Sequence, residues 1–388
     1  MAKHALLSAS GAKRWMSCPP SALLEKQFPD QTSGFAEEGT FAHALGDLIL
    51  SRALEQIDEE TYKRSLAPLE KDDYYSQGLV EYVDQYVTLA LEKVSEARAR
   101  SSDAVILLEQ RLDFSQWVPE GFGTGDVVII ADEIMEIIDL KYGKGVAVSA
   151  EDNPQMRLYA LGALAQFEYL YDIRKIRMTI CQPRLDSIST EELWVNDLVC
   201  WAETELKPRA QMAFKGEGEY CAGDHCRFCK AKFTCRARAE ANLELAKMDF
   251  RDPAVLADDE IGEVLAKAAQ LQTWASDIAS YALDQAENHG KKWDGWKLVE
   301  GRSTRKYMDE EAVANTLLAG GRTEDDIYTK SLLGITAMEK LLGKKNFGQI
   351  LGELIIKPAG KPVLVPEADK RPEINSTASA QKDFSEVE

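Results

Sequence analysis

Residues 125–141, GDVVIIADEIMEIIDLK, are the most informative segment about the fold. Runs of Val and Ile flank its central Asp-Glu pair, a pattern that predicts two strands joined by a two-residue turn. In such a hairpin Asp126 lies opposite Asp139, with Cβ atoms about 4.5–5.5 Å apart, and Lys141 points to the same face. Like charges at this distance repel unless a divalent cation lies between them. The hairpin therefore predicts a metal site or, alternatively, an ordinary turn region with solvated charges.

The elements around this hairpin predict an α/β domain followed by a helical region. Apolar periodicity predicts helices over 35–56, 73–100, 153–171 and 197–214, and strands over 104–112, 126–131, 134–141, 175–183 and 191–195. Further helices are expected over 236–248 and 258–289. We expect the first domain to cover residues 1–248, a mainly helical accessory region to cover 249–356, and an extended or disordered tail to cover 357–388.

Composition excludes several classes of protein. The chain has 388 residues, of which 45% are hydrophobic, so it can bury a core. Its aliphatic runs are too short to span a membrane, and residues 1–15 lack the apolar stretch of a secretory signal. A cytoplasmic protein is therefore expected. The net charge of −19 argues against coating nucleic acid through global charge, although a local basic groove remains compatible with it.

Four of the seven cysteines fall between residues 221 and 235, a density typical of metal ligands. The spacing Cys221-X4-Cys226-X2-Cys229-X5-Cys235 could form a local zinc site. The remaining cysteines are Cys18, which no local spacing explains, and Cys181 and Cys200, which we expect to be buried packing residues.

The cysteine segment is also basic. Residues 225–238 contain no carboxylate and five cations, which are Arg227, Lys230, Lys232, Arg236 and Arg238. Such a patch could follow a DNA backbone, or it could be a solvated loop around a metal site.

Four motifs, in this order, resemble the RecB-like branch of the PD-(D/E)XK nuclease superfamily. They are EGTFAH (residues 38–43), Gly125-Asp126, IDLKYGK (138–144) and QMRLY (155–159). The resemblance implies a restriction-endonuclease-like core, in which a central mixed sheet is flanked by helices. It also implies a metal-dependent DNA exonuclease that hydrolyses phosphodiester bonds.

The same resemblance assigns residue roles. It implies Mg²⁺ or Mn²⁺ held by His43, Asp126, Asp139 and the carbonyl of Leu140. The catalytic residues it implies are Asp126, Asp139, Lys141, Gln155 and Tyr159. Gln155 and Tyr159 are four residues apart on a helix and share one face. Glu109, placed near the end of a predicted strand, is a further acidic candidate.

In the iron–sulfur branch of these nucleases, three cysteines after the nuclease motifs and one cysteine far upstream of them together bind the cluster. Cys18, in the context Ser-Cys-Pro after a short N-terminal helix, resembles that upstream residue. The resemblance implies a structural [4Fe-4S] cluster on Cys18, Cys226, Cys229 and Cys235, with Cys221 spare. The local zinc site described above is the alternative.

The whole chain also resembles a family of such nucleases common in phages and prophages. A role in phage recombination or replication is implied, beside a single-strand-binding or annealing protein. Two other classes of function stay open at this point. One is a non-catalytic DNA-binding or assembly module on a nuclease scaffold, and the other is a zinc-stabilised interaction protein.

Overall fold

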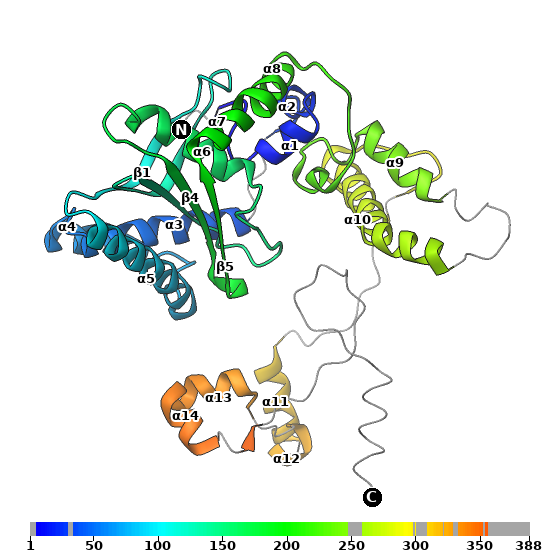
Figure 1. The fold of residues 1–388 in the computed structure, drawn as a ribbon. Helices are drawn as coiled ribbons and strands as arrows, with labels where there is room; N and C mark the ends of the chain where they lie inside the picture. The colour runs from blue at the N-terminus through cyan, green and yellow to red at the C-terminus, as the bar shows by residue number, and fades with distance from the viewer. Residues whose placement is uncertain are drawn as a thin grey trace, which may run out of the picture. The chain divides into compact units, whose positions relative to one another are not determined.

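The computed structural model describes residues 5–29, 34–246, 258–297, 299, 309–320, 322–328, 333–351 and 354–355. Its centre is one five-stranded sheet with strand order β1-β2-β3-β4-β5 (Figure 1). The strands are β1 (Val105–Asp113), β2 (Phe122–Ala131), β3 (Ile134–Leu140), β4 (Lys175–Gln182) and β5 (Ser187–Trp194). All neighbours are antiparallel except β3 and β4, which are parallel. The predicted α/β fold with a mixed sheet is confirmed.

The hairpin has the predicted two-residue turn. Its ladder runs from Ala131–Ile134 at the turn to Val127–Ile138. Asp132 occupies the turn with φ 52°, a left-handed conformation that Asp tolerates better than most residues. Backbone pairing stops at Val127, so Asp126 and Asp139 lie one position beyond the last ladder pair.

Helices cover both faces of the sheet, which explains the almost continuous aliphatic runs in β2 and β3. Side chains of β2 alternate between two cores: Val128 and Ile130 pack in one, and Val127 and Ile129 in the other. The first core includes α1 (Ala12–Ser17), α6 (Pro154–Phe167), α7 (Val195–Trp201) and α8 (Lys207–Lys215). The second core includes α3 (Gly34–Ala53) and α5 (Gln77–Arg100). The parallel pair β3–β4 requires a crossover, and α6 provides it.

Several short elements complete the first part of the chain. They are α2 (Ser21–Glu25), α4 (Glu59–Leu69), the 3-10 turns η1 (Pro183–Leu185) and η3 (Asp224–Phe228), and the π-turn η2 (Ala202–Leu206), which joins α7 to α8. Helix α4 was not expected from the sequence. Its N-terminus is capped by Asp58, whose side chain accepts a hydrogen bond from the backbone N–H of Thr61.

The C-terminal part is helical, as predicted. It contains α9 (Arg236–Ala246), α10 (Asp258–His289), α11 (Glu310–Ala319), α12 (Glu324–Ile327), α13 (Ile335–Leu342) and α14 (Lys344–Leu351). The chain divides into two compact units, residues 1–284 and 285–388. The predicted domain boundary at residue 248 and the predicted tail lie outside the described residues. In the part of the chain that the structure describes, no helix is long and apolar enough to cross a membrane.

Candidate metal and active site

Three carboxylates occupy one row across three neighbouring strands. The register pairs Leu108 with Val127 and Gln110 with Gly125, which puts Glu109 of β1 opposite Asp126 of β2. Asp139 of β3 holds the next place in the same row. The ladder skips this row, and Glu109 has φ 45°. The strands therefore open where the acidic side chains gather.

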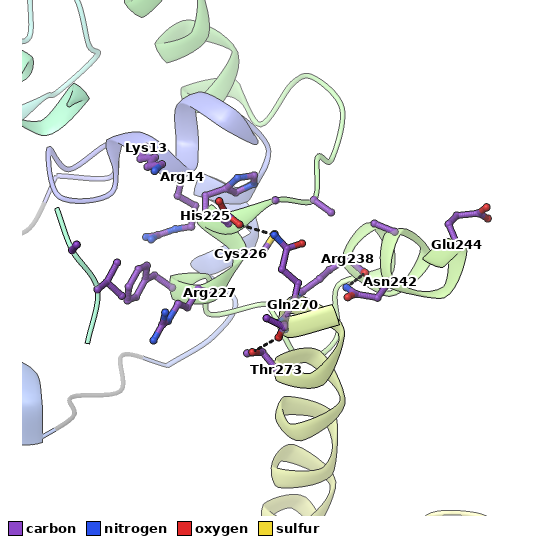
Figure 2. A pocket seen from close by; sticks show the side chains of 18 of the residues that line it. Lys13, Arg14, His225, Cys226, Arg227, Arg238, Asn242, Glu244, Gln270 and Thr273 are labelled. Carbon is purple, nitrogen blue, oxygen red and sulfur yellow. Dashed lines mark hydrogen bonds between the residues drawn. The ribbon is translucent and has the colours of Figure 1, made fainter. Parts of the chain in front are cut away.

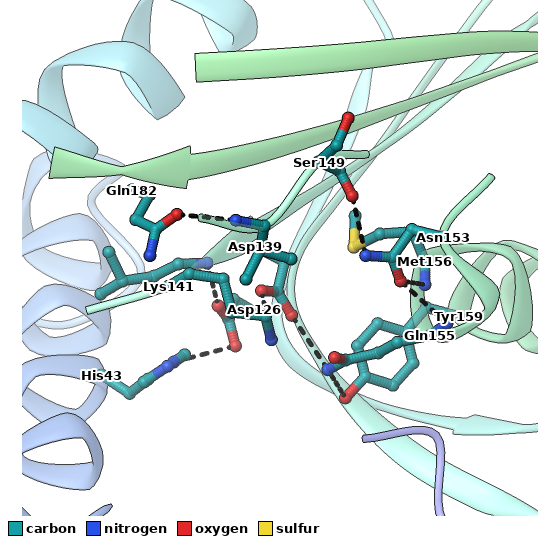
Figure 3. A network of polar contacts seen from close by, with 12 residues as sticks. His43, Asp126, Asp139, Lys141, Ser149, Asn153, Gln155, Met156, Tyr159 and Gln182 are labelled. Atoms are coloured by element: carbon teal, nitrogen blue, oxygen red, sulfur yellow. Dashed lines mark hydrogen bonds and ion pairs between the residues drawn. The ribbon is translucent and has the colours of Figure 1, made fainter. Parts of the chain in front are cut away.

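Glu109, Asp126 and His43 form a group with metal-ligand spacing. One ligand atom from each of the three lies within 4.8 Å of the others. His43 projects from α3, and its Nδ1 is 3.1 Å from Asp126 Oδ1 (Figure 3). The other oxygen of Asp126 accepts a hydrogen bond of 2.7 Å from the backbone N–H of Leu140. That bond fixes the carboxylate in place and leaves the first oxygen facing His43.

Asp139 lies beside this group with different partners. Its side chain is 3% exposed, and its Oδ2 is 2.8 Å from the Lys141 ammonium nitrogen. Its Oδ1 accepts a hydrogen bond of 3.4 Å from the Gln155 amide, which also donates to the Tyr159 hydroxyl at 3.0 Å (Figure 3). Carboxylate, ammonium, amide and phenol are thus joined in one chain of polar contacts.

Helix α6 is positioned by its N-terminus and by a glycine. The Asn153 side chain accepts hydrogen bonds from the backbone N–H groups of Gln155 and Met156, so it caps the helix next to the site. The Tyr159 ring packs so closely on β2 that a Cβ on Gly123 would lie 2.7 Å from it. Glycine at this position is required for the ring to reach the site.

Electrostatics show what the cluster does when no cation is bound. Burial and the neighbouring Asp126 raise the pKa of Glu109 to about 7. Burial opposes protonation of His43, yet the charge and hydrogen bond of Asp126 raise its pKa to about 9. Burial also raises the pKa of Asp139, against the pull of Lys141. Protons therefore offset the crowded negative charge here, and the oxygen and imidazole donors could hold a divalent cation.

The cysteines gather around a second location. Cys18, Cys221, Cys226, Cys229 and Cys235 line one small cavity. The backbone N–H of Cys221 is 3.5 Å from the Cys18 sulfur, although 203 positions separate the two residues. Four thiolates around one zinc ion lie about 3.8 Å apart, given Zn–S bonds of about 2.3 Å. Among the described residues, no three of these sulfurs lie within 4.8 Å of one another.

The other two cysteines differ from each other. Cys181 is buried in β4, as expected, and burial raises the pKa of its thiol to about 11. Cys200 is exposed on α7, so its predicted burial is wrong. It lies on the outward side of an amphipathic helix whose inward residue is Leu198.

The basic patch is partly neutralised by a residue far along the chain. Arg227, Lys230 and Arg236 are exposed. Asp277 of α10 is 3.3 Å from Lys232 and 2.8 Å from Arg238. The sequence window 225–238 contains no acid, and packing against α10 supplies one.

The chain matches the family described as "Protein of unknown function (DUF2800)" over residues 4–372. It belongs to this family.

Two solved structures are similar to this DUF2800 chain. One, from Eubacterium rectale, is described as a candidate exonuclease; it is 14% identical, covers 57% of this chain and 86% of its own, and has a TM-score of 0.32. The other, SSO0001, is 17% identical, covers 50% of this chain and 85% of its own, and has a TM-score of 0.23.

The DUF2800 structure brings most of the sequence-derived site residues together. His43, Asp126, Asp139, Lys141, Gln155 and Tyr159 form a connected cluster. Glu109, in the middle of β1 instead of near its end, takes the place in the His43–Asp126 group that the resemblance assigned to Asp139. Leu140 contributes its N–H to Asp126, and a ligand role for its carbonyl stays a prediction.

Two positioning residues were missed by sequence analysis. Asn153 had a signal, since an Asn before Pro at a helix start is a typical cap. Gln182 had none. Its buried amide donates to the carbonyls of Gly143 and Val146, at 2.6 and 2.8 Å, and accepts from the N–H of Val148 at 3.0 Å. It therefore holds the loop that follows Lys141 (Figure 3).

Proposed function

We propose that this DUF2800 chain is a divalent-metal-dependent deoxyribonuclease that acts as an exonuclease. The observation that carries the proposal is the row of Glu109, Asp126 and Asp139, with His43 at one side and Lys141 at the other. A cluster of acids, of which Asp139 is buried, with a histidine and a lysine beside it is typical of sites that bind a cation and hydrolyse phosphodiesters.

His43, Glu109 and Asp126 would hold Mg²⁺ or Mn²⁺, with Asp139 as the neighbouring carboxylate. When bound, the cation supplies Lewis-acid stabilisation of charge on the phosphoryl oxygens. The Lys141 ammonium, held by Asp139, is placed to orient a water molecule or to offset negative charge on the phosphoryl group. Gln155 and Tyr159 orient Asp139 and present an amide and a hydroxyl to the substrate strand.

A structural [4Fe-4S] cluster on Cys18, Cys226, Cys229 and Cys235 is part of the proposal. Support comes from the convergence of these thiols on one cavity. The exposed Cys221 is the spare thiol. A role in phage recombination or replication, beside a single-strand-binding or annealing protein, rests on sequence resemblance.

The test is cleavage of linear DNA labelled separately at each end, with Mg²⁺, Mn²⁺ or a chelator. We expect metal-dependent release of label from one end, and loss of at least about a thousandfold in rate for Asp139→Asn. Asp132→Asn is the matched control, because it makes the same change in the exposed turn of the same hairpin. If the wild-type protein binds DNA but does not cleave it in the presence of either Mg²⁺ or Mn²⁺, catalysis is refuted and a DNA-binding module is favoured.

A further inference from the structure

A large cavity of the first unit lies away from the acidic row. Its volume is about 1020 Å³, at the upper end of the range for ligand pockets. Its walls come from α1, the loop after β3, the cysteine segment, α9 and α10 (Figure 2). Helix α10, which follows the α/β part of the chain, contributes Gln270 and Thr273. A helix outside the sheet domain thus completes this cavity.

The cavity carries more positive than negative charge in a chain whose net charge is −19. Lys13, Arg14, Arg227 and Arg238 line it, against Asp224 and Glu244. Arg14 pairs with Glu25, and Arg238 pairs with Asp277. Neither Lys13 nor Arg227 has an ion pair with any residue that the structure describes. These two cations are available to a ligand that carries negative charge.

An aromatic ring lies beside these cations. Phe228 lines the cavity and is 64% exposed, and the guanidinium carbon of Arg227 lies 5.8 Å from its ring centre. Amides and hydroxyls of Asn242, Gln270 and Thr273 face the same space (Figure 2). Cations for phosphates together with an exposed ring for stacking are the chemistry that binds unpaired nucleic acid.

The cavity is connected to the acidic row through one loop. Val146 and Ala147 lie on its wall, five and six positions after Lys141. Gln182 fixes this loop through Gly143, Val146 and Val148. A strand held in the cavity therefore contacts a loop whose other end carries the catalytic lysine.

We infer that this cavity binds a single-stranded segment of nucleic acid, with α10 as one wall, and that the loop held by Gln182 leads the strand to Lys141. The inference deepens the proposed function and rests on it for the direction of the strand. It assigns the substrate class as an unpaired strand, because stacking on Phe228 needs a base that is free of its partner.

The test measures binding without cleavage, by fluorescence anisotropy of a labelled oligothymidylate in the presence of a chelator. Thr273→Glu places a negative charge in the cavity from an exposed position of α10. Thr88→Glu is the matched control, because both hydroxyls donate to the carbonyl four residues earlier, and Thr88 lies on α5 away from the cavity. We expect Thr273→Glu and Lys13→Glu each to weaken binding about tenfold, and Thr88→Glu to leave it within about twofold.

Phe228→Ala is expected to weaken binding of the oligothymidylate about tenfold, and a blunt hairpin duplex should compete poorly. Unchanged affinity of Thr273→Glu, Lys13→Glu and Phe228→Ala would overturn the inference, as would equal competition by the duplex. Asp139→Asn separates the two proposals. If the Asp139→Asn variant binds the oligothymidylate with wild-type affinity, and the wild-type protein does not cleave DNA with either metal, the proposed catalysis is refuted and the binding site is supported.

Discussion

At the scale of single residues, Arg177 shows how burial decides the behaviour of two similar acids. It lies on β4 between Glu136 of β3 and Glu192 of β5, which the register places on either side of it. Glu136 is 1% exposed and one of its oxygens has no hydrogen-bond partner, so burial raises its pKa despite Arg177. Hydrogen bonds from Lys175 and Arg177 lower the pKa of the more exposed Glu192.

The two acids should therefore contribute to stability with opposite pH dependence. The contribution of Glu136 is fully present below pH 4.5, its unfolded value, and is lost as the pH rises through the raised folded pKa. The contribution of Glu192 to stability is present above pH 4.5, its unfolded pKa, and is lost as the pH falls through the lowered folded pKa. Urea denaturation of wild type, Glu136→Gln and Glu192→Gln between about pH 3.5 and 7.5 measures both. Parallel pH profiles for the two variants would contradict the assignment.

At the scale of elements, the start of α6 couples stability to the site. Asn153 caps the helix two residues before Gln155, and Gln155 contacts both Asp139 and Tyr159. Helix α4 carries an equivalent cap, Asp58, on a peripheral helix with no buried residue. Both caps accept hydrogen bonds from backbone N–H groups at a helix start, but only Asn153 supports a residue that contacts the acidic cluster.

Removal of each cap should separate these effects. Asn153→Ala should lower the free energy of unfolding by about 1 kcal/mol, and Asp58→Ala should also lower it. Asn153→Ala should also slow DNA cleavage about ten- to a hundredfold, because Gln155 loses its backbone anchor. Asp58→Ala should cleave at the wild-type rate. Denaturant melts and single-turnover cleavage rates measure the two effects, and equal cleavage by both variants would show that the cap has no part in the site.

At the scale of the whole molecule, the N-terminal segment is tied to the cysteine segment by more than thiols. Glu25 accepts a hydrogen bond of 2.7 Å from the backbone N–H of Lys230, and its other oxygen lies 2.7 Å from Arg14. Cys18 is brought to the same place. Closing a loop of about 200 residues constrains the unfolded chain, so a shared cluster would stabilise the whole first unit.

Protein purified without oxygen should be brown and contain iron and sulfide in comparable amounts. Cys18→Ser should lose the colour and lower Tm by about 5–10 °C, because the ligand loss also frees the N-terminal segment. Cys200→Ser is the matched control, since Cys200 is exposed and outside the cavity. Colourless protein with stoichiometric zinc that tolerates Cys18→Ser and not Cys221→Ser would establish the local zinc site instead.

Local sequence patterns were sufficient to predict most of the strands and helices, including the hairpin. The strands around residues 126–141 and the helix that carries Gln155 follow from short-range periodicity and turn chemistry, which act between residues close in the chain. The two-residue turn was enough to put Asp126 opposite Asp139, and the resemblance to RecB-like nucleases implied His43 beside them. Side chains at fixed spacing on regular elements must share a face.

Contacts between residues of distant elements could not be predicted from local patterns and depend on the packing of the fold. The register of β1 on β2 puts Glu109 beside Asp126, and α10 brings Asp277 to the basic segment. Gln182 holds the loop that contains Gly143 and Val146, nearly forty positions earlier, and no sequence motif predicts this contact. Such contacts depend on how whole elements pack against each other. Many alternative packings would bury the same apolar faces, and local sequence patterns do not distinguish between them.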